Sequence, residues 1–285
     1  MAGVRLVVGT DAHRTLETGN ILLVPDASVG LNAGDVELLR RVRLDSEHHK
    51  NVSYHPARDK VGGLDSASPV ERQAVHDAIR RFSKSAIDLA ARILPGYSRD
   101  WRVELASLRP LEEAGRGLPF IERNDLLHTD AFPRRPTRGG LILRIFYNFH
   151  ASLPRTWLIS DPFETFAVRY AEDVGLRRIA RRGGFARGML RRLRPGLGRS
   201  AYDEFMLQCH DYLKSSAEFQ SNSPKYRLEF PPGCVWMVFT DIVPHAVQSG
   251  QFALEQTLIV RHTSLAQPER APISILEKLA GCSLA

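Results

Sequence analysis

The spacing of apolar residues predicts one long helix in the first third of the chain. Between residues 69 and 93, apolar side chains recur at near-helical intervals, at Val75, Ile79, Phe82, Ile87, Leu89 and Ile93. Ser68 stands before this segment as an N-cap residue, and Pro69 occupies its first turn. Pro95 and Gly96 end the pattern. A second helix is predicted between Leu31 and Val42.

Other segments have the patterns of β-strands. Residues 101–110 alternate apolar and polar side chains, and residues 20–25 contain a short apolar run. Further strand-like runs occupy residues 140–149, 156–160, 226–230, 234–240 and 252–260. Between the two groups of strands, residues 161–225 have a helical composition that begins with an acidic first turn at Asp161 and Glu164.

This order of elements predicts a single domain of the α+β class over residues 1–285. Its core is expected to be a double-stranded β-helix of the jelly-roll or cupin type, built from residues 101–160 and 226–262. Residues 1–100 are expected to form a mixed and partly helical region. Residues 161–225 are expected to form a helical basic insertion, so that helices flank the sheets.

The charge of the chain points to acidic partners. The 285 residues carry a formal net charge of +7, which favours a nucleic acid, an anionic membrane surface, or a phosphorylated or carboxylated substrate. Residues 177–199 hold nine arginines and no acidic residue. Apolar residues alternate with these arginines, as in a helix that lies on an anionic membrane. Gly183 and Gly184 interrupt that pattern, and a solvated charged surface is an equal alternative.

Cysteines and apolar runs indicate the compartment. The three cysteines have neither metal-site spacing nor the even number of a disulfide framework. The N-terminus lacks the pattern of a signal peptide, and no apolar stretch approaches the ~18 residues of a membrane-spanning helix. These features predict a cytoplasmic protein, with peripheral attachment to the inner membrane as an open possibility.

His128 and Asp130 are the leading candidates for chemistry. On an extended segment, residues two apart project from the same face, so an imidazole and a carboxylate can bind one metal ion together. His245 follows another strand-like run and is the best candidate for a third ligand. Two histidines and one carboxylate on one face of a metal form the facial triad of non-haem Fe(II) oxygenases. The tripeptide alone is weak evidence, because a strand-end histidine bonded to a nearby loop would look the same.

The remaining candidates are interpreted as structural. His76 and His210 fall on predicted helices and lack a partner motif, so structural or solvent-exposed roles are favoured for both. Asp241 stands four residues before His245 and is expected to cap a turn rather than to bind the metal.

With both ligand segments located, the sequence resembles the Fe(II)/2-oxoglutarate-dependent dioxygenases, and more closely the hydroxylases of 3-deoxy-D-manno-octulosonic acid (Kdo). The matching segments are residues 50–54, 107–110, 127–133, 135–139, 143–146, 154–157, 161–164, 236–241, 245–251 and 255–257. The resemblance implies that His128, Asp130 and His245 bind catalytic Fe(II), with 2-oxoglutarate as cosubstrate and ascorbate as a further candidate cofactor. It also implies hydroxylation of the 3-position of Kdo in lipopolysaccharide (Kdo-lipid A) to form Ko, while 2-oxoglutarate and O2 become succinate and CO2.

One departure from the superfamily concerns the cosubstrate. Many relatives place an arginine roughly ten residues after the distal histidine to hold the far carboxylate of 2-oxoglutarate, whereas this chain has Gln256 in that neighbourhood. An amide can form hydrogen bonds but not the charged fork of a guanidinium. Arg144 is therefore the first choice for this role and Arg123 the second, and Gln256 is expected to contact the cosubstrate through hydrogen bonds.

The resemblance also suggests contacts to the substrate. Arg134, Arg135 and Arg138 follow the ligand pair closely and are candidates to bind the carboxylates and phosphates of Kdo-lipid A. The alternative for these arginines is an ordinary solvated loop.

Two other functions remain open at this stage. The same chemistry on a protein side chain or a small metabolite is one of them. The other is a non-enzymatic basic module that binds RNA or a membrane. Aromatic RNA-binding motifs are not evident, so no nucleic-acid partner is expected. The sequence does not determine the oligomeric state.

Overall fold

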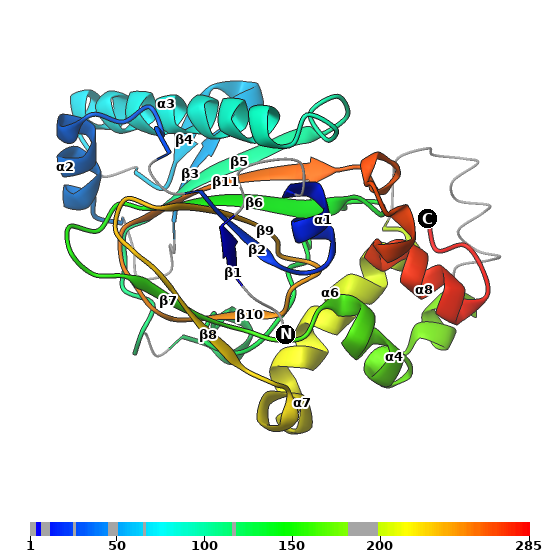
Figure 1. Ribbon diagram of the computed structural model, residues 1–285. Helices are drawn as coiled ribbons and strands as arrows, with labels where there is room; N and C mark the ends of the chain where they lie inside the picture. The colour runs from blue at the N-terminus through cyan, green and yellow to red at the C-terminus, as the bar shows by residue number, and fades with distance from the viewer. Residues whose placement is uncertain are drawn as a thin grey trace.

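Two β-sheets form the centre of the molecule (Figure 1). The computed structural model describes residues 4–6, 12–24, 27–44, 51–64, 67–115, 118–181 and 199–285. The larger sheet has the order β1 (Val4–Leu6), β2 (Ile21–Val24), β9 (Val235–Phe239), β6 (Leu141–Asn148), β11 (Ala253–Val260), β5 (Arg102–Arg109), β3 (Val52–His55), β4 (Lys60–Gly62). The smaller sheet has the order β10 (His245–Ser249), β7 (Arg155–Ile159), β8 (Tyr226–Phe230).

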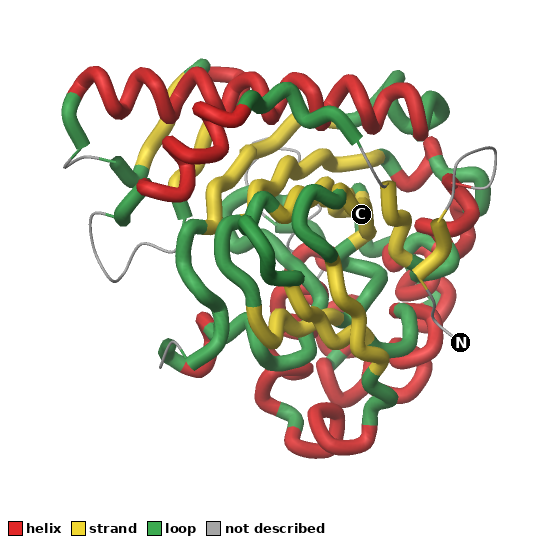
Figure 2. Tube along the Cα trace, turned by 60° about the vertical axis from the view of Figure 1, so that its left-hand side comes forward, coloured by secondary structure: helices red, strands yellow, loops and turns green. Residues whose placement is uncertain are grey.

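Helices pack outside these sheets (Figures 1 and 2). They are α1 (Ala12–Glu17), α2 (Ala33–Arg41), α3 (Pro69–Ile93), α4 (Phe163–Val174), α6 (Ala201–Ser215), α7 (Ala217–Asn222) and α8 (Pro272–Ala280). The long α3 covers the outer face of the larger sheet, where it contacts β5 and β11. Helices α4, α6 and α8 group together at another side of the sheets.

The long helix α3 begins and ends where the sequence predicts. The side chain of Ser68 accepts a hydrogen bond from the backbone N–H of Glu71 at 3.2 Å, which satisfies one of the exposed amides of the first turn. Val75, Ile79 and Phe82 are fully buried, so the apolar face identified in the sequence is the face that packs on the sheet. The shorter helix α2 also lies within its predicted range and is capped by Asn32.

Aromatic side chains from both sheets meet in the core. The rings of Phe230 in β8 and Trp236 in β9 stack with centroids 4.0 Å apart. Trp157 of β7 packs edge-on against Trp236 at 5.7 Å, and Phe146 of β6 contacts both tryptophans. These large rings are almost completely buried and stabilise the association of the two sheets.

The arrangement confirms the predicted α+β class with paired antiparallel sheets and outer helices. Strand pairs are antiparallel except β1 with β2, which is parallel. Residues 1–100, predicted to be mixed and partly helical, also supply β1 to β4 to the larger sheet. The predicted jelly-roll core is therefore extended by strands from the N-terminal region.

The insertion at residues 161–225 contains α4, α6 and α7, as its composition predicts. Most of the arginine-rich segment falls in residues 182–198, outside the described part of the chain, and the proposed membrane contact of residues 177–199 stays a prediction. Among the described helices, none has the length and apolarity needed to cross a bilayer.

Candidate metal centre

Backbone pairing brings the two candidate histidines together. The N–H of His128 donates to the carbonyl of His245 at 3.1 Å, and the N–H of His245 donates to the carbonyl of His128 at 2.9 Å. The N–H of Asp130 donates to the carbonyl of Thr240 at 2.9 Å, so the His128–Asp130 segment is extended against the turn before β10. The two side chains therefore leave one face of the segment, as the sequence predicts.

The imidazoles are held in a defined orientation. Nδ1 of His128 lies 2.8 Å from the carbonyl of Leu126, and Nδ1 of His245 lies 2.9 Å from the carbonyl of Val243. A carbonyl only accepts hydrogen bonds, so each Nδ1 carries the proton and each Nε2 presents a lone pair. The ring of Trp157 also stacks on the His245 ring with centroids 5.2 Å apart. The sequence does not reveal these orienting groups, because two are backbone carbonyls.

The protonation states suit metal binding. Burial lowers the pKa of His128 and of His245 below the ordinary imidazole value of 6.5, so both rings are neutral at neutral pH. Burial by itself would raise the pKa of Asp130. The guanidinium of Arg144, with a side-chain hydrogen bond from Thr240, outweighs that effect and holds the pKa of this carboxyl below its ordinary value. The carboxylate is therefore ionised while its two neighbours are neutral.

These three side chains, called the triad below, offer a metal-binding set. One ligand atom from each of His128, Asp130 and His245 lies within 4.8 Å of the others. Nε2 of His128 is 3.8 Å from Oδ1 of Asp130, too long for a strong direct hydrogen bond between them. Two neutral imidazole nitrogens and one carboxylate oxygen are the donor set of non-haem Fe(II) sites, and the residues present fit that metal.

The triad opens into a cavity of about 260 Å³ between the sheets. Residues from several elements form its wall: Asn51, Arg109, Ile121, Glu122, Asn124, His128, Asp130, Arg144, Phe146, Arg155, Trp157, His210, Lys214, His245 and Val247. Four of these side chains are cationic and two are carboxylates. A cavity with this excess of positive groups favours anionic molecules beside the metal.

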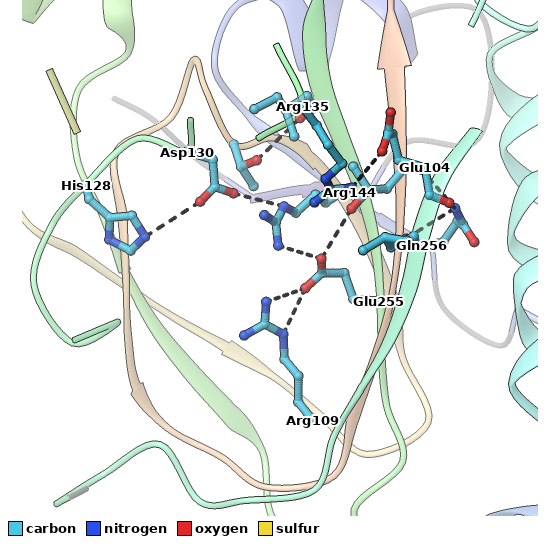
Figure 3. Close-up of polar contacts among 12 residues, drawn as sticks. Glu104, Arg109, His128, Asp130, Arg135, Arg144, Glu255 and Gln256 are labelled. Carbon is cyan, nitrogen blue, oxygen red and sulfur yellow. Dashed lines mark hydrogen bonds and ion pairs between the residues drawn. The ribbon is translucent and has the colours of Figure 1, made fainter. Parts of the chain in front are cut away.

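An arginine cluster, comprising Arg109, Arg144 and Arg155, forms part of the wall. Nε of Arg144 forms an ion pair with Oδ2 of Asp130 at 2.9 Å, and its Nη1 pairs with Glu255 (Figure 3). Arg109 pairs with the other carboxylate oxygen of Glu255, with Nη2 at 2.6 Å. Arg144, the first choice for the cosubstrate, thus lines the cavity, whereas sequence reasoning did not identify Arg109 or Arg155.

Deeper in the cluster, Arg155 is almost completely buried. Its Nη1 donates to the carbonyl of Gly250 at 2.8 Å, and its Nη2 pairs with Glu113 at 3.2 Å. A guanidinium this deeply buried needs such partners, because desolvation otherwise opposes its charge. Arg155 begins β7, and only the fold brings it into the same cavity as Arg109 and Arg144.

Two further polar side chains reach the cavity from helix α6. His210 and Lys214 are one helical turn apart and both line the wall. Nδ1 of His210 lies 2.8 Å from the carbonyl of Thr129, and Nζ of Lys214 donates to the carbonyl of Ile121 at 2.8 Å. The sequence interpretation gave His210 a structural role. Its four-residue spacing from Lys214 was the available signal that both share one face.

Gln256 is placed away from the cavity. It is fully buried on the side of β11 that faces α3, where Ser83 donates to its Oε1 at 2.6 Å and its Nε2 donates to the carbonyls of Glu104 and Thr257. Successive residues of a strand face opposite sides, so Glu255 turns inward and Gln256 outward (Figure 3). Gln256 is not among the residues that line the cavity, so the structure does not support its expected contact with the cosubstrate.

The other predicted arginines also lie outside the cavity wall. Arg123 forms an exposed ion pair with Asp125 at 2.7 Å. Arg135 pairs with Glu104 at 2.6 Å and lies over the ring of Phe132, while Arg134 and Arg138 are exposed. Arg123 therefore does not contact the space in which a cosubstrate would bind. The substrate roles of the three loop arginines stay predictions, restricted to groups outside the cavity.

Asp241 is a structural group, as expected, but its contact is different from a simple turn cap. Its Oδ1 accepts a hydrogen bond from the backbone N–H of Ile142 in β6 at 3.0 Å. The side chain is almost fully buried, and burial raises its pKa to about 7. It connects the turn before His245 to the larger sheet and is not part of the triad.

Comparison with known proteins decides the family. A family model described as 3-deoxy-D-manno-oct-2-ulosonic acid (Kdo) hydroxylase matches residues 7–283. The chain belongs to the Kdo hydroxylase family. The expectation of an Fe(II)/2-oxoglutarate-dependent dioxygenase is thereby confirmed, and it is supported by the structural matches to this family. No curated protein matches the chain.

Solved structures of a Kdo hydroxylase match closely in fold. The chain is similar to KdoO in complex with α-ketoglutarate and Fe(III), with a TM-score of 0.84 and 31% identity, over 96% of this chain and 90% of that chain. It is equally similar to KdoO in complex with cobalt(II), with the same TM-score, identity and coverage. The complex of KdoO with succinate and Fe(III) matches with a TM-score of 0.83 over the same shares at 31% identity. The predicted jelly-roll fold is confirmed by these matches.

Proposed function

We propose that this Kdo hydroxylase family member hydroxylates the 3-position of Kdo in Kdo-lipid A to form Ko. The observation that carries the proposal is the convergence of the triad on a cationic cavity in a chain of this family. In this proposal, His128 and His245 hold Fe(II) through Nε2 and Asp130 holds it through its carboxylate. Bound Fe(II) and 2-oxoglutarate supply the oxidising power for C–H hydroxylation by O2, with succinate and CO2 as coproducts.

The protein's own contribution is orientation and charge. The carbonyls of Leu126 and Val243 keep the two imidazoles in the tautomer that presents Nε2. Arg144 holds the carboxylate of Asp130 in place and keeps it ionised. Phe146 and Trp157 add aromatic surface to the cavity wall, and a less polar wall strengthens these electrostatic interactions.

The arginine cluster is the proposed binding site for the distal carboxylate of 2-oxoglutarate. Arg144 and Arg109 share Glu255, so their guanidinium groups lie side by side at the cavity wall. Guanidinium groups bind carboxylates through paired N–H donors, which Gln256 does not provide at this position. Arg144 remains the first choice for this role, and Arg109 joins it as a second candidate.

The proposed substrate also suggests a place of action. Kdo-lipid A carries carboxylates and phosphates on a lipid, and the net charge of +7 suits such an anionic surface. We propose that the enzyme acts on the cytoplasmic side of the inner membrane, where the exposed Arg134 and Arg138 contact phosphate groups outside the cavity. This location is inferred from the charge and the proposed substrate.

Product analysis tests the proposal directly. The purified protein, supplied with Fe(II), 2-oxoglutarate and O2, is expected to convert Kdo-lipid A to a product that is heavier by one oxygen atom. The amount of succinate should equal the amount of product, and isotopically labelled O2 should label both. The variant His245→Ala should form neither. Equal succinate formation with and without Kdo-lipid A would point to another substrate, such as a protein side chain or a small metabolite.

A further inference from the structure

Helix α6 is fixed firmly beside the triad, although it comes from the helical insertion and not from the sheets. Its N-terminus has a capping box in which Ser200 and Asp203 exchange side-chain and backbone hydrogen bonds. The carboxylate of Asp203 also accepts from the backbone N–H of Thr137 at 2.8 Å, which ties the helix to the loop after the metal motif. Phe205, Cys209 and Leu213 are buried on its inner side. A helix held in this way presents its side chains to the cavity with little freedom.

His210 is connected directly to the metal-binding segment. Its Nδ1 lies 2.8 Å from the carbonyl of Thr129, the residue between His128 and Asp130. Its ring meets the His128 ring edge to face, with centroids 5.0 Å apart. The carbonyl of Thr129 only accepts, so Nδ1 of His210 carries the proton and Nε2 is left as an acceptor. His210 lines the cavity, where Nε2 is the acceptor atom of its ring.

Lys214 places a cation on the same wall. Lys214 as a whole is only 3% exposed, and its ammonium group donates to the carbonyl of Ile121 in the segment Phe120–Glu122. It lines the same cavity as His210 and lies one turn farther along α6. An acceptor and a cation on one helical face are about 5–6 Å apart at their Cβ atoms. A sugar acid presents hydroxyl donors and a carboxylate at comparable spacing.

The cationic groups of the cavity therefore fall into two sets on different elements. The arginine cluster belongs to β5, β6 and β7, where Arg109 and Arg144 share the carboxylate of Glu255. Lys214 belongs to α6 and has the acceptor of His210 beside it. Of the two sets, only the α6 wall pairs a cation with a hydrogen-bond acceptor of fixed tautomer. A dicarboxylate cosubstrate has no need of that acceptor, whereas a polyhydroxylated acid uses both groups.

We infer that the α6 wall, formed by His210 and Lys214, recognises the sugar acid. Nε2 of His210 accepts a hydrogen bond from a hydroxyl of the substrate, and the ammonium group of Lys214 contacts the substrate carboxylate. The inference deepens the proposed function, because it assumes that a Kdo unit enters this cavity. It makes the helical insertion the element that selects the substrate, while the sheets hold the metal and the cosubstrate.

Equilibrium binding under anaerobic conditions tests this inference. Wild type and the variants Lys214→Met, Lys214→Arg and His210→Phe are loaded with Fe(II) and 2-oxoglutarate and titrated with Kdo. Lys214→Met is expected to weaken Kdo binding roughly 10- to 100-fold, the usual loss for a hydrogen bond to a charged group. His210→Phe should weaken it about 2- to 10-fold, because a neutral hydrogen bond is lost. Lys214→Arg should restore part of the affinity, since it restores the charge.

Two controls separate recognition from folding and from cosubstrate binding. Lys225→Met removes an exposed lysine just after α7 and should leave Kdo binding unchanged. The affinity for 2-oxoglutarate, read from the visible absorption of its Fe(II) complex, should be the same in all variants. An unchanged affinity for Kdo in Lys214→Met would overturn the inference. So would a weaker affinity for 2-oxoglutarate in Lys214→Met, because Lys214 would then serve the cosubstrate.

An error in the proposed function can be distinguished from an error in the role of the α6 wall. If the wild type binds Kdo but does not hydroxylate it, the proposed reaction is wrong, while the ranking of the variants in Kdo binding still decides the role of the α6 wall. If the wild type with Fe(II) and 2-oxoglutarate binds neither Kdo nor Kdo-lipid A, both the proposed substrate and this inference are overturned.

Discussion

His128 and His245 are joined by a pair of backbone hydrogen bonds, one in each direction, at 3.1 and 2.9 Å. The two residues belong to distant segments of the sequence. Backbone groups, and not the imidazole side chains, hold these two segments together. Side-chain hydrogen bonds to nearby carbonyls then turn both rings toward Asp130. The backbone pairing and these carbonyls therefore set the geometry of the triad.

The first prediction concerns metal binding. The variants Asp130→Ala and His245→Ala should fold like the wild type, because the backbone bridge is unchanged, but should lose stoichiometric Fe(II). Fe(II) at 100 times its dissociation constant should stabilise the wild type by about 2.7 kcal/mol and leave these variants unaffected. Thermal unfolding with and without metal provides the measurement. Asp211→Ala, which removes an exposed carboxylate on α6, serves as the control and should behave like the wild type.

The second prediction concerns pH. Burial lowers the pKa of His128 and His245 in the folded protein, whereas the unfolded chain has the ordinary value of 6.5. Below that pH the unfolded state takes up protons that the folded state does not, so stability of the metal-free protein is lost as the pH falls. Denaturant unfolding between about pH 8 and about pH 5 should show this loss, and His128→Phe should show a smaller one. Parallel pH profiles for both proteins would contradict the assignment.

The third prediction separates Arg144 from the arginines outside the cavity. Arg144→Met should raise the KM for 2-oxoglutarate on the order of 10- to 100-fold, because a charge-assisted contact is lost. Arg123→Met should leave that KM unchanged, since Arg123 forms an exposed pair with Asp125. Steady-state kinetics with varied 2-oxoglutarate would measure both. A larger effect from Arg123 than from Arg144 would reverse the placement of the cosubstrate.

The fourth prediction concerns Gln256, which contacts Ser83 and backbone carbonyls beneath α3. Gln256→Ala should lower the free energy of unfolding by about 1–3 kcal/mol, because buried partners lose their hydrogen bonds. The KM for 2-oxoglutarate should not change. Chemical denaturation and kinetics on one preparation would test both parts, and a raised KM without loss of stability would restore the original interpretation of this residue.

Local patterns in the sequence predict much of the fold. The limits of α3 follow from Ser68, Pro69 and the helical period, and the major strands follow from short apolar runs. The region before α3 is less predictable, because β3 and β4 are short and acquire their strand structure by pairing with β5 and with each other. The triad is predictable because a two-residue spacing and a distant histidine are a recognisable set.

The cavity wall is harder to predict for physical reasons. Successive side chains of a strand point to opposite faces of the sheet, but the sequence does not show which face lines the cavity. It therefore does not show whether Glu255 or Gln256 points toward the cavity. Arg155 and Lys214 are buried charges and Arg109 is half-buried, and burial of a charge depends on partners such as Glu113 that only the fold supplies. Likewise, His210 acquires its position from a contact with Thr129 across two segments.

The central claim is that three side chains hold an iron ion that binds 2-oxoglutarate. Anaerobic titration of the protein with Fe(II) and then 2-oxoglutarate measures this directly, through the charge-transfer absorption of the chelated 2-oxo acid. The absorption band is expected in the wild type at one equivalent of iron and should be missing in Asp130→Ala. The same band in both proteins, or in neither, would contradict this claim.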